Sequence, residues 1–384
     1  MTRQQDREEW VRLNTCRFCI GSHLHTCTGY RCEPAIEQAE QYFDRRMKME
    51  IGLIDVDSHN FPNIPLMKIS AWHKRNGDNV EFAIAGKRYD KVYMSKIFTE
   101  TKEPKGIVAE TIVRGGSGYD LKNALPYEIE HIYPDYSLYP ELTADKAFGM
   151  LTRGCPRCNH GFCITPQKDG VVSHKVADLS EFWNGQKKIV LLDQNILACK
   201  DRMELLRQLE ESKAEVEFNG GVDIRFVTDE IIEVLKRIKV KDYHFAWDDP
   251  RENLEQQFQK VKESGLKNPD RCRVYVLTNF WSTIEEDLYR IYKLRRMGFV
   301  PFVMIYDKQK FVDKYGRWLP DVGERYTREQ MIHFKTCQHM QRWSGTKGII
   351  KLCPNFEDYE SLKKWKEGGC KVPELIVEEK EETK

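Results

Sequence analysis

Short apolar runs alternate with polar or amphipathic stretches along most of the chain, a pattern that predicts strands joined by helices or loops. In the first half, a helical pattern with apolar Ile64, Met67, Ile69 and Trp72 covers residues 63–76. Four strands are predicted around it, at 50–55, 80–85, 90–94 and 106–113. This alternation favours an open, parallel, Rossmann-like α/β sheet, whose ligands lie beyond the carboxyl ends of its strands.

The second half shows the same alternation. Six apolar runs, each followed by polar residues, predict strands at 147–151, 189–192, 214–218, 243–247, 273–277 and 301–305. Amphipathic stretches between them, such as 203–212 and 228–238, predict helices. Polar residues at the carboxyl ends of strands are typical of the active face of a β/α barrel. Because we count six strands rather than eight, we expect a partial (β/α)6 barrel of the TIM type.

These patterns divide the chain into five parts. In order, they are a Cys-rich segment with a short helix (1–48), the α/β domain (49–118), an aromatic-rich linker (119–145), the barrel (146–310), and a helical extension with a charged tail (311–384). A length of 384 residues agrees with more than one domain.

The composition narrows the function classes. Lys and Arg number 61 and Asp and Glu number 60, so the net charge of +1 gives no indication of a nucleic-acid partner. No apolar run approaches the roughly 20 residues that a membrane span needs, and the polar N-terminus does not resemble a signal peptide. We therefore expect a cytoplasmic protein without a membrane partner. In that compartment the 12 cysteines are better explained as metal ligands than as disulfides.

Three cysteines lie close together after the first predicted barrel strand, at Cys155, Cys158 and Cys163. Thiolates bind zinc or iron–sulfur clusters, and a closed zinc site takes four ligands. Three ligands with an open fourth position favour a cluster. A zinc knuckle that takes a further cysteine from elsewhere is the alternative.

The sequence Thr-Arg-Gly-Cys-Pro at 152–156 and Phe162 before Cys163 resemble the cluster loop of radical S-adenosylmethionine (SAM) enzymes. In that family three cysteines hold a [4Fe-4S] cluster whose open iron binds SAM. The usual spacing is Cys-x3-Cys-x2-Cys, whereas this chain has Cys-x2-Cys-x4-Cys, a spacing also found in the pyrimidine synthase of thiamine biosynthesis. The resemblance implies radical chemistry on an unknown substrate and an electron donor such as a flavodoxin or ferredoxin.

The resemblance also implies a SAM site at the strand ends. Asp193 or Asn195 would bind the SAM amino group, Arg225 its carboxylate, and Asp223, Asp248 and Asn279 ribose hydroxyls or substrate, with Phe162 beside the cluster. Each could instead cap a strand end or form a structural ion pair. Cys199 is open to three interpretations, as a fourth ligand, a radical relay or a buried apolar residue.

The first domain resembles cobalamin-binding domains at three strand ends. These are Asp57-Ser-His59, Ser95-Lys-Ile97 and Gly115-Gly116, with Pro62 in place of the usual glycine. The resemblance implies His59 as a cobalt ligand oriented by Asp57, and Ser95 as a contact to the nucleotide tail. Bound cobalamin would favour methyl or alkyl transfer. The alternative is the same fold without cobalamin.

Cysteines also cluster at the N-terminus. Cys16, Cys19, Cys27 and Cys32 have the short pair typical of a zinc knuckle, with a second iron–sulfur cluster as the alternative. Near the C-terminus, His333, Cys337, His339 and Cys353 could surround a metal, because His333 and Cys337 lie one helical turn apart.

Two functions from different classes follow. The first is a radical SAM enzyme, with or without cobalamin. The second is a non-catalytic zinc-binding scaffold whose cysteines are all structural. Such a scaffold could bind nucleic acid, but the nearly neutral net charge of the chain argues against that version.

Overall fold

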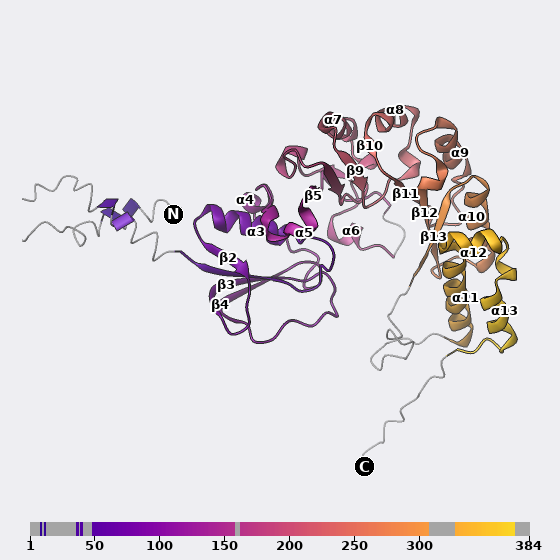
Figure 1. Cartoon of the computed structure of the whole chain (residues 1–384), viewed down its shortest axis with the longest axis horizontal. Coiled ribbons are helices and arrows are strands. Elements are labelled where there is room, and N and C mark those ends of the chain that lie inside the picture. The colour runs from indigo at the N-terminus through magenta and orange to yellow at the C-terminus, as the bar shows by residue number, and fades with distance from the viewer. Residues whose placement is uncertain are drawn as a thin grey trace, which may run out of the picture. The chain divides into compact units, whose positions relative to one another are not determined.

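The computed structural model describes residues 8–9, 11–12, 36–37, 39–40, 48–157, 162–306 and 327–372 (Figure 1). It divides the chain into two compact units, 1–144 and 145–384. Both contain helices and parallel strands, which confirms the predicted mixed α/β class. The four N-terminal cysteines lie outside the described residues. No helix in the described part of the chain is long and apolar enough to cross a membrane.

The first unit contains a four-stranded sheet in which every neighbouring pair is parallel. Its strands are β1 (Glu50–Asp55), β2 (Asn79–Phe82), β3 (Arg88–Ser95) and β4 (Val108–Gly115), in the order β2-β1-β3-β4. β1 spans the residues predicted from its apolar run. The parallel sheet is compatible with a Rossmann-like fold, and the carboxyl ends of β1, β3 and β4 meet at one edge.

One helix, α3 (Ile64–Arg75), connects β1 to β2. Asn63 caps it, because its side-chain oxygen accepts a hydrogen bond from the Leu66 N–H at 3.2 Å. Buried Leu66 and Ile69 pack with Ile51 and Leu53 of β1. The connections at 83–87 and 96–107 contain no helix, which distinguishes this unit from a regular doubly wound fold.

The segment predicted as a linker, 119–145, instead belongs to the first unit as far as residue 144. It contains two short helices, α4 (Tyr127–Glu130) and α5 (Pro140–Thr143). Ile129 joins the apolar core under α3, and Asp135 forms an ion pair with Lys74 at 2.6 Å. The Tyr139 hydroxyl donates to the Asp55 carboxylate at 2.7 Å. Through Ile129, Asp135 and Tyr139 the segment therefore packs on the first unit rather than separating two domains.

The second unit contains two larger parallel sheets and a short antiparallel pair of strands. The first sheet has the order β10-β9-β8-β5 and the second β11-β12-β13, while β6 and β7 pair antiparallel. The strands are β5 (Lys146–Gly149), β6 (Thr152–Arg153), β7 (His174–Lys175), β8 (Lys188–Leu191), β9 (Glu215–Phe218), β10 (Lys239–Val240), β11 (Tyr243–Ala246), β12 (Cys272–Thr278) and β13 (Val300–Ile305).

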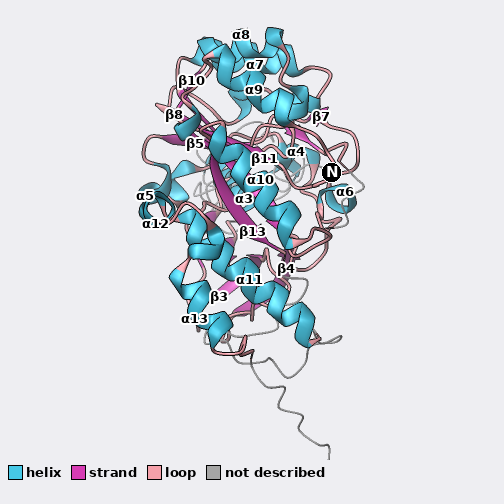
Figure 2. Ribbon diagram, turned by 90° about the vertical axis from the view of Figure 1, so that its right-hand side faces the viewer, coloured by secondary structure: helices cyan, strands magenta, loops and turns pink. Residues whose placement is uncertain are grey.

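Helices follow these strands. They are α6 (Thr165–Lys168), α7 (Arg202–Ser212), α8 (Asp229–Arg237), α9 (Glu255–Ser264), α10 (Ile284–Arg296), α11 (Arg328–Gly345), α12 (Lys347–Leu352) and α13 (Glu360–Glu367). α10 packs against β12 and β13, and α11 against β13 and α10 (Figure 2). Both begin with a capping box, formed by Thr283 with Glu286 and by Thr327 with Gln330. The predicted C-terminal extension is thus helical where the structure describes it.

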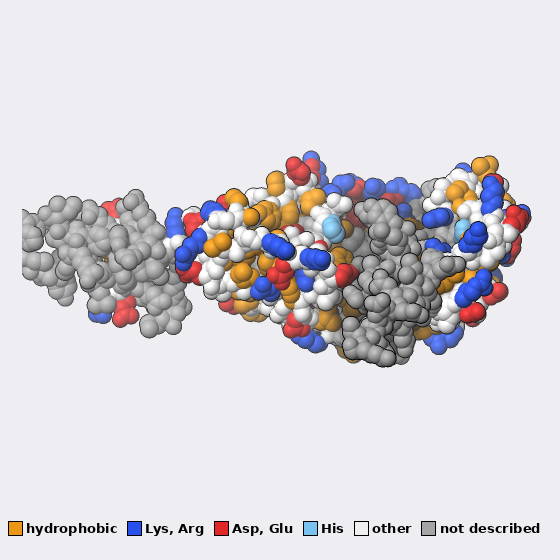
Figure 3. Space-filling model, turned by 90° about the horizontal axis from the view of Figure 1, so that it is seen from below, with side chains coloured by type: hydrophobic (Ala, Val, Ile, Leu, Met, Phe, Trp, Pro, Cys, Tyr) orange, Lys and Arg blue, Asp and Glu red, His pale blue; other side chains and the backbone are white. Residues whose placement is uncertain are grey.

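Charged side chains of both signs are interspersed on the face shown in Figure 3, in agreement with the balanced composition. Exposed ion pairs include Arg88 with Glu110 and Lys364 with Glu360. Such pairs contribute little to stability in water.

Candidate functional site

The cysteine loop begins where β5 ends. Gly154 has a positive φ of 87°, and a side chain there would lie 2.2 Å from the carbonyl oxygen of Val172. The next residue, Cys155, donates its backbone N–H to the Gly170 carbonyl at 3.2 Å. Glycine therefore permits the close crossing of two backbone segments that presents Cys155.

The two described cysteines of this loop are free thiols. Cys155 is half-buried and Cys163 is exposed, while Cys158 lies outside the described residues. The Cys155 sulfur accepts a hydrogen bond from the side-chain amide of Asn195 at 3.6 Å. An accessible sulfur with a polar neighbour is suited to metal ligation.

Asp193 fixes the start of this loop. Its buried carboxylate accepts hydrogen bonds from the Leu151 N–H at 3.1 Å and from the Thr152 hydroxyl at 2.6 Å. Burial raises its pKa to about 6, although these hydrogen bonds act in the opposite direction. Asp193 was predicted as a SAM ligand, but the structure uses it to attach the cysteine loop to the end of β8.

Polar side chains from neighbouring strand ends form a continuous network beside Cys155. The Asn195 amide donates to Asp223 at 2.9 Å, and Asp223 accepts from the Arg225 guanidinium at 2.9 Å. Arg225 also donates to Glu252 through two nitrogens. Burial alone would lower the pKa of Arg225, but these two carboxylates raise it. Arg225, predicted to bind the SAM carboxylate, is already paired on both sides.

Asp248 follows β11 and forms an ion pair with Arg157 at 3.2 Å. Burial raises the pKa of Asp248, while the nearby guanidinium of Arg157 acts in the opposite direction. The Nε and Nη2 atoms of Arg157 are buried and have no hydrogen-bond partner among the described residues. A buried donor without a partner is rare, and here it lies between two predicted cluster ligands in the sequence. The sequence did not indicate a role for Arg157, because a single arginine between two cysteines has no specific pattern.

Aromatic rings connect the cysteine loop to the ends of β12 and β13. The ring centroid of Phe162 lies 5.5 Å from that of Phe280, which lies 4.6 Å from that of Tyr306. Asn279 has a positive φ of 61° and donates its side-chain amide to the Tyr306 carbonyl at 2.8 Å. This contact joins the two strand ends and gives Asn279 a structural role.

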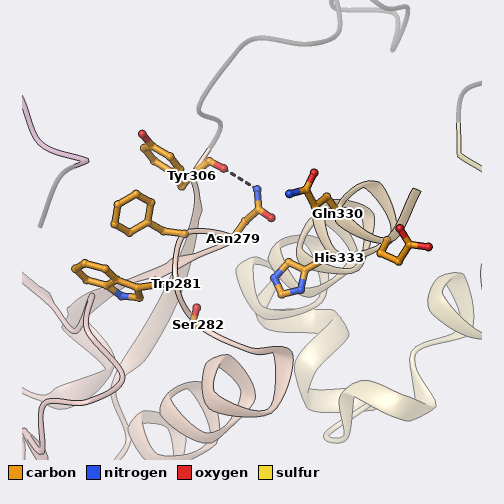
Figure 4. A pocket seen from close by; sticks show the side chains of 8 residues that line it. Asn279, Trp281, Ser282, Tyr306, Gln330 and His333 are labelled. Atoms are coloured by element: carbon orange, nitrogen blue, oxygen red, sulfur yellow. Dashed lines mark hydrogen bonds between the residues drawn. The ribbon is translucent and has the colours of Figure 1, made fainter. Parts of the chain in front are cut away.

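A cavity of about 580 Å³ opens beside these rings (Figure 4). It is lined by Asn279, Phe280, Trp281, Ser282, Tyr306, Glu329, Gln330 and His333. The lining combines aromatic surface with amide, hydroxyl and imidazole groups, as small-molecule sites do. The polar residues come from α11 and from the turn before α10. The sequence pattern did not indicate that these two segments share a cavity.

The first unit has a separate edge where the corrinoid residues were predicted. The Asp57 carboxylate accepts hydrogen bonds from the N–H groups of Ile97 and Phe98, at 2.7 and 3.0 Å. Burial raises the pKa of Asp57, but these hydrogen bonds outweigh it, so the pKa is lowered. The structure has no hydrogen bond between Asp57 and His59, which is exposed and has a φ of 52°.

Ser95 and Gly116 also have internal roles at this edge. The Ser95 hydroxyl accepts a hydrogen bond from the Asn63 amide at 2.9 Å. Gly116 has a φ of 94°, and a side chain there would lie 2.3 Å from the Lys96 carbonyl oxygen. Together these contacts close the loops after β1, β3 and β4 onto each other. Asp57, Ser95 and Gly116 thus have internal contacts at this edge, and the corrinoid site that the resemblance implies stays a prediction.

Replacement of Gly116 by alanine is expected to destabilise the protein by at least about 2 kcal/mol, because the new side chain meets both positive φ and the Lys96 carbonyl. Gly115 is the matched control, since it has open space around it and no positive φ. For Gly115→Ala we expect a change within about 0.5 kcal/mol. Urea unfolding of the two variants measures the difference, and equal midpoints would contradict the tight loop packing.

Comparison with known proteins does not assign this arrangement of side chains: no protein-family model matches the chain, and a search of curated proteins gives no match.

Proposed function

We propose that the second unit is a radical SAM enzyme built as a partial (β/α)6 barrel. Its main strands follow chain order, as β5, β8 and β9 in one sheet and β11, β12 and β13 in the other. A hydrogen bond from the Val222 N–H to the His244 carbonyl at 2.7 Å connects the segment after β9 with β11. Parallel strands in chain order, with polar residues at their carboxyl ends, support the barrel proposal.

The observation that carries the proposal is the contact between Cys155 and Asn195. It places one end of the cysteine loop beside the polar network of Asp223 and Arg225, at the carboxyl ends of β8 and β9. Phe162, next to Cys163, contacts the aromatic residues after β12. Both described ends of the loop therefore lie at the strand ends where a barrel enzyme binds its substrates.

The chemistry follows from this placement. Cys155, Cys158 and Cys163 would hold a [4Fe-4S] cluster, which supplies an electron that cleaves SAM to methionine and a hydrogen-abstracting 5′-deoxyadenosyl radical. The chain's own residues position the reactants. Asn195 donates a hydrogen bond to the Cys155 sulfur and so orients it. Arg157, with two buried donors unused, is the better candidate for the SAM carboxylate than Arg225.

The aromatic cavity is the proposed substrate site. Phe280 and Trp281 supply flat apolar surface, and Gln330 supplies hydrogen-bonding groups. An electron donor such as a flavodoxin or ferredoxin would reduce the cluster. Cobalamin has no part in this proposal, because Asp57 and Gly116 both make contacts within the loops that follow the strands of the first unit.

Anaerobic reconstitution followed by electron paramagnetic resonance (EPR) tests the proposal. We expect the reduced protein to give a [4Fe-4S] signal that changes when SAM is added, and to release 5′-deoxyadenosine. For Arg157→Met we expect the same cluster signal without SAM, but at least tenfold weaker SAM binding, because a charge-assisted carboxylate contact is lost. Arg237→Met is the control, since Arg237 is exposed on α8 and pairs with Glu210.

The zinc scaffold predicts a different result. Stoichiometric zinc without iron after reconstitution would reject the radical SAM proposal and favour the scaffold. A cluster signal that SAM does not change would reject the proposed SAM site at Arg157.

A further inference from the structure

Three potential metal ligands meet where α10 and α11 pack together. Asp287 comes from α10, and His333 and Cys337 lie one turn apart on α11. One ligand atom from each side chain lies within 4.8 Å of the others. Asp287 and Cys337 are fully buried, and His333 is half-buried and lines the cavity (Figure 4). The geometry needed to enclose one small cation is therefore present.

Asp287 pairs with Arg290 through only one of its two carboxylate oxygens. Its Oδ1 accepts a hydrogen bond from Arg290, but its Oδ2 is buried and accepts no hydrogen bond from the part of the chain that the structure describes. The neighbouring Ser282 hydroxyl, which lines the cavity, lies close enough to the Asp287 carboxylate to lower its pKa, although no hydrogen bond of ordinary geometry joins the two groups. Buried carboxylate oxygens without a partner are costly, so they indicate an ion or another polar group.

The donor set favours a particular metal. Cysteine sulfur, histidine nitrogen and aspartate oxygen are the three ligand types of zinc sites, and three protein ligands leave one position open. Cys337 as a thiolate and Asp287 would present two negative charges to the cation, one of which Arg290 already offsets in part. Arg290 on the other oxygen would orient the Asp287 carboxylate, as outer groups of metal sites commonly do.

We propose that Asp287, His333 and Cys337 bind one Zn²⁺ at the edge of the cavity, with the fourth position reached from the side that Ser282 and His333 line. The site differs from the C-terminal metal set suggested by sequence. His339 lies 3.4 Å from the Ser361 hydroxyl, and the Cys353 sulfur lies 3.2 Å from the Asn355 carbonyl oxygen. This proposal does not rest on the radical SAM proposal.

Metal analysis of the full-length protein tests the site. Protein stripped with a chelator is titrated with Zn²⁺, and bound zinc is counted by mass spectrometry. We expect His333→Ala and Cys337→Ser each to bind one equivalent less than the wild type, and Asp287→Asn to bind zinc at least tenfold more weakly. Co²⁺ serves as a second probe, because only a thiolate ligand gives intense charge-transfer absorption. That absorption should decrease in Cys337→Ser.

Two matched controls separate this site from the other cysteines. His339→Ala and Cys353→Ser alter the same part of the chain and should retain all zinc. If Cys337→Ser fails to fold, His333→Ala decides the question, because His333 is half-buried. Wild-type zinc content in folded His333→Ala would overturn the proposal. The iron content of His333→Ala should be unchanged, so failure of this site and failure of the cluster proposal are distinguishable.

Discussion

Replacement of Arg290 by methionine is expected to lower the free energy of unfolding by about 3–5 kcal/mol. The guanidinium is fully buried and donates to the carbonyl oxygens of Trp247 and Asp248, both at 2.7 Å, and to that of Leu277 at 2.9 Å. It also pairs with Asp287. Methionine keeps much of the volume but leaves three carbonyls and one carboxylate without their donor. Urea unfolding followed by tryptophan fluorescence measures the loss.

Arg296→Met is the matched control, because Arg296 is exposed on the same helix. A change within about 0.5 kcal/mol is expected there. Asp287→Asn combined with Arg290→Met removes both charges, and we expect it to be more stable than Arg290→Met alone. Equal unfolding midpoints for Arg290→Met and Arg296→Met would contradict the role given to the buried guanidinium.

The Arg290→Met variant should also depend on pH. Burial raises the pKa of Asp287 to about 6, and the positive charge of Arg290 opposes this rise. Without Arg290, the folded-state pKa lies higher still, so the folded protein holds a proton that the unfolded chain releases. Stability is then retained at low pH and lost as the pH rises through the raised pKa. In metal-free protein, we expect Arg290→Met to lose more free energy of unfolding, relative to the wild type, at about pH 8 than at about pH 5.

Strand positions were predictable because each apolar run is short and ends in polar residues. The run at 50–55 and β1 coincide, and helix 63–76 differs from α3 by one residue at each end. The packing of 119–144 was not predictable, because tyrosines and prolines give the same local pattern in a linker and in a segment that covers a sheet. The contact of Ile129 with β1 and α3 shows that the segment packs on the sheet. This contact joins residues far apart in the chain, so no local pattern indicates it.

The sequence predicted where the residues of the candidate site lie, but it did not predict which groups they contact. Asp193 and Arg225 lie at strand ends, as expected from the sequence. Their roles depend on the backbone of Leu151 and on Glu252, which no local pattern connects to them. Asp287 and His333 illustrate the same limit, since charged and polar residues in an amphipathic helix are normally solvent-exposed, and only the packing of α10 on α11 buries them.

Alanine at Cys155 or Cys163 is expected to abolish iron binding and, with it, cleavage of SAM. A cluster held by three cysteines has no spare protein ligand, so loss of either sulfur leaves too few ligands to retain it. Cys163 is the sharper test. Its side chain is exposed, so its replacement should leave the fold unchanged and alter only the metal. Iron content after anaerobic reconstitution and the EPR signal of the reduced protein measure the effect.

Cys199→Ala is the control, and it resolves the interpretations that the sequence left open for this residue. The thiol is fully buried, lies 4.0 Å from the Asp201 carboxylate, and burial raises its pKa. The described neighbour of this sulfur is the Asp201 carboxylate rather than a cysteine of the loop, so we expect this variant to bind iron as the wild type does. Loss of iron in Cys199→Ala would make Cys199 a fourth ligand and close the position proposed for SAM. Full iron content in Cys163→Ala would end the cluster assignment, because no other described cysteine lies in the same loop except Cys155.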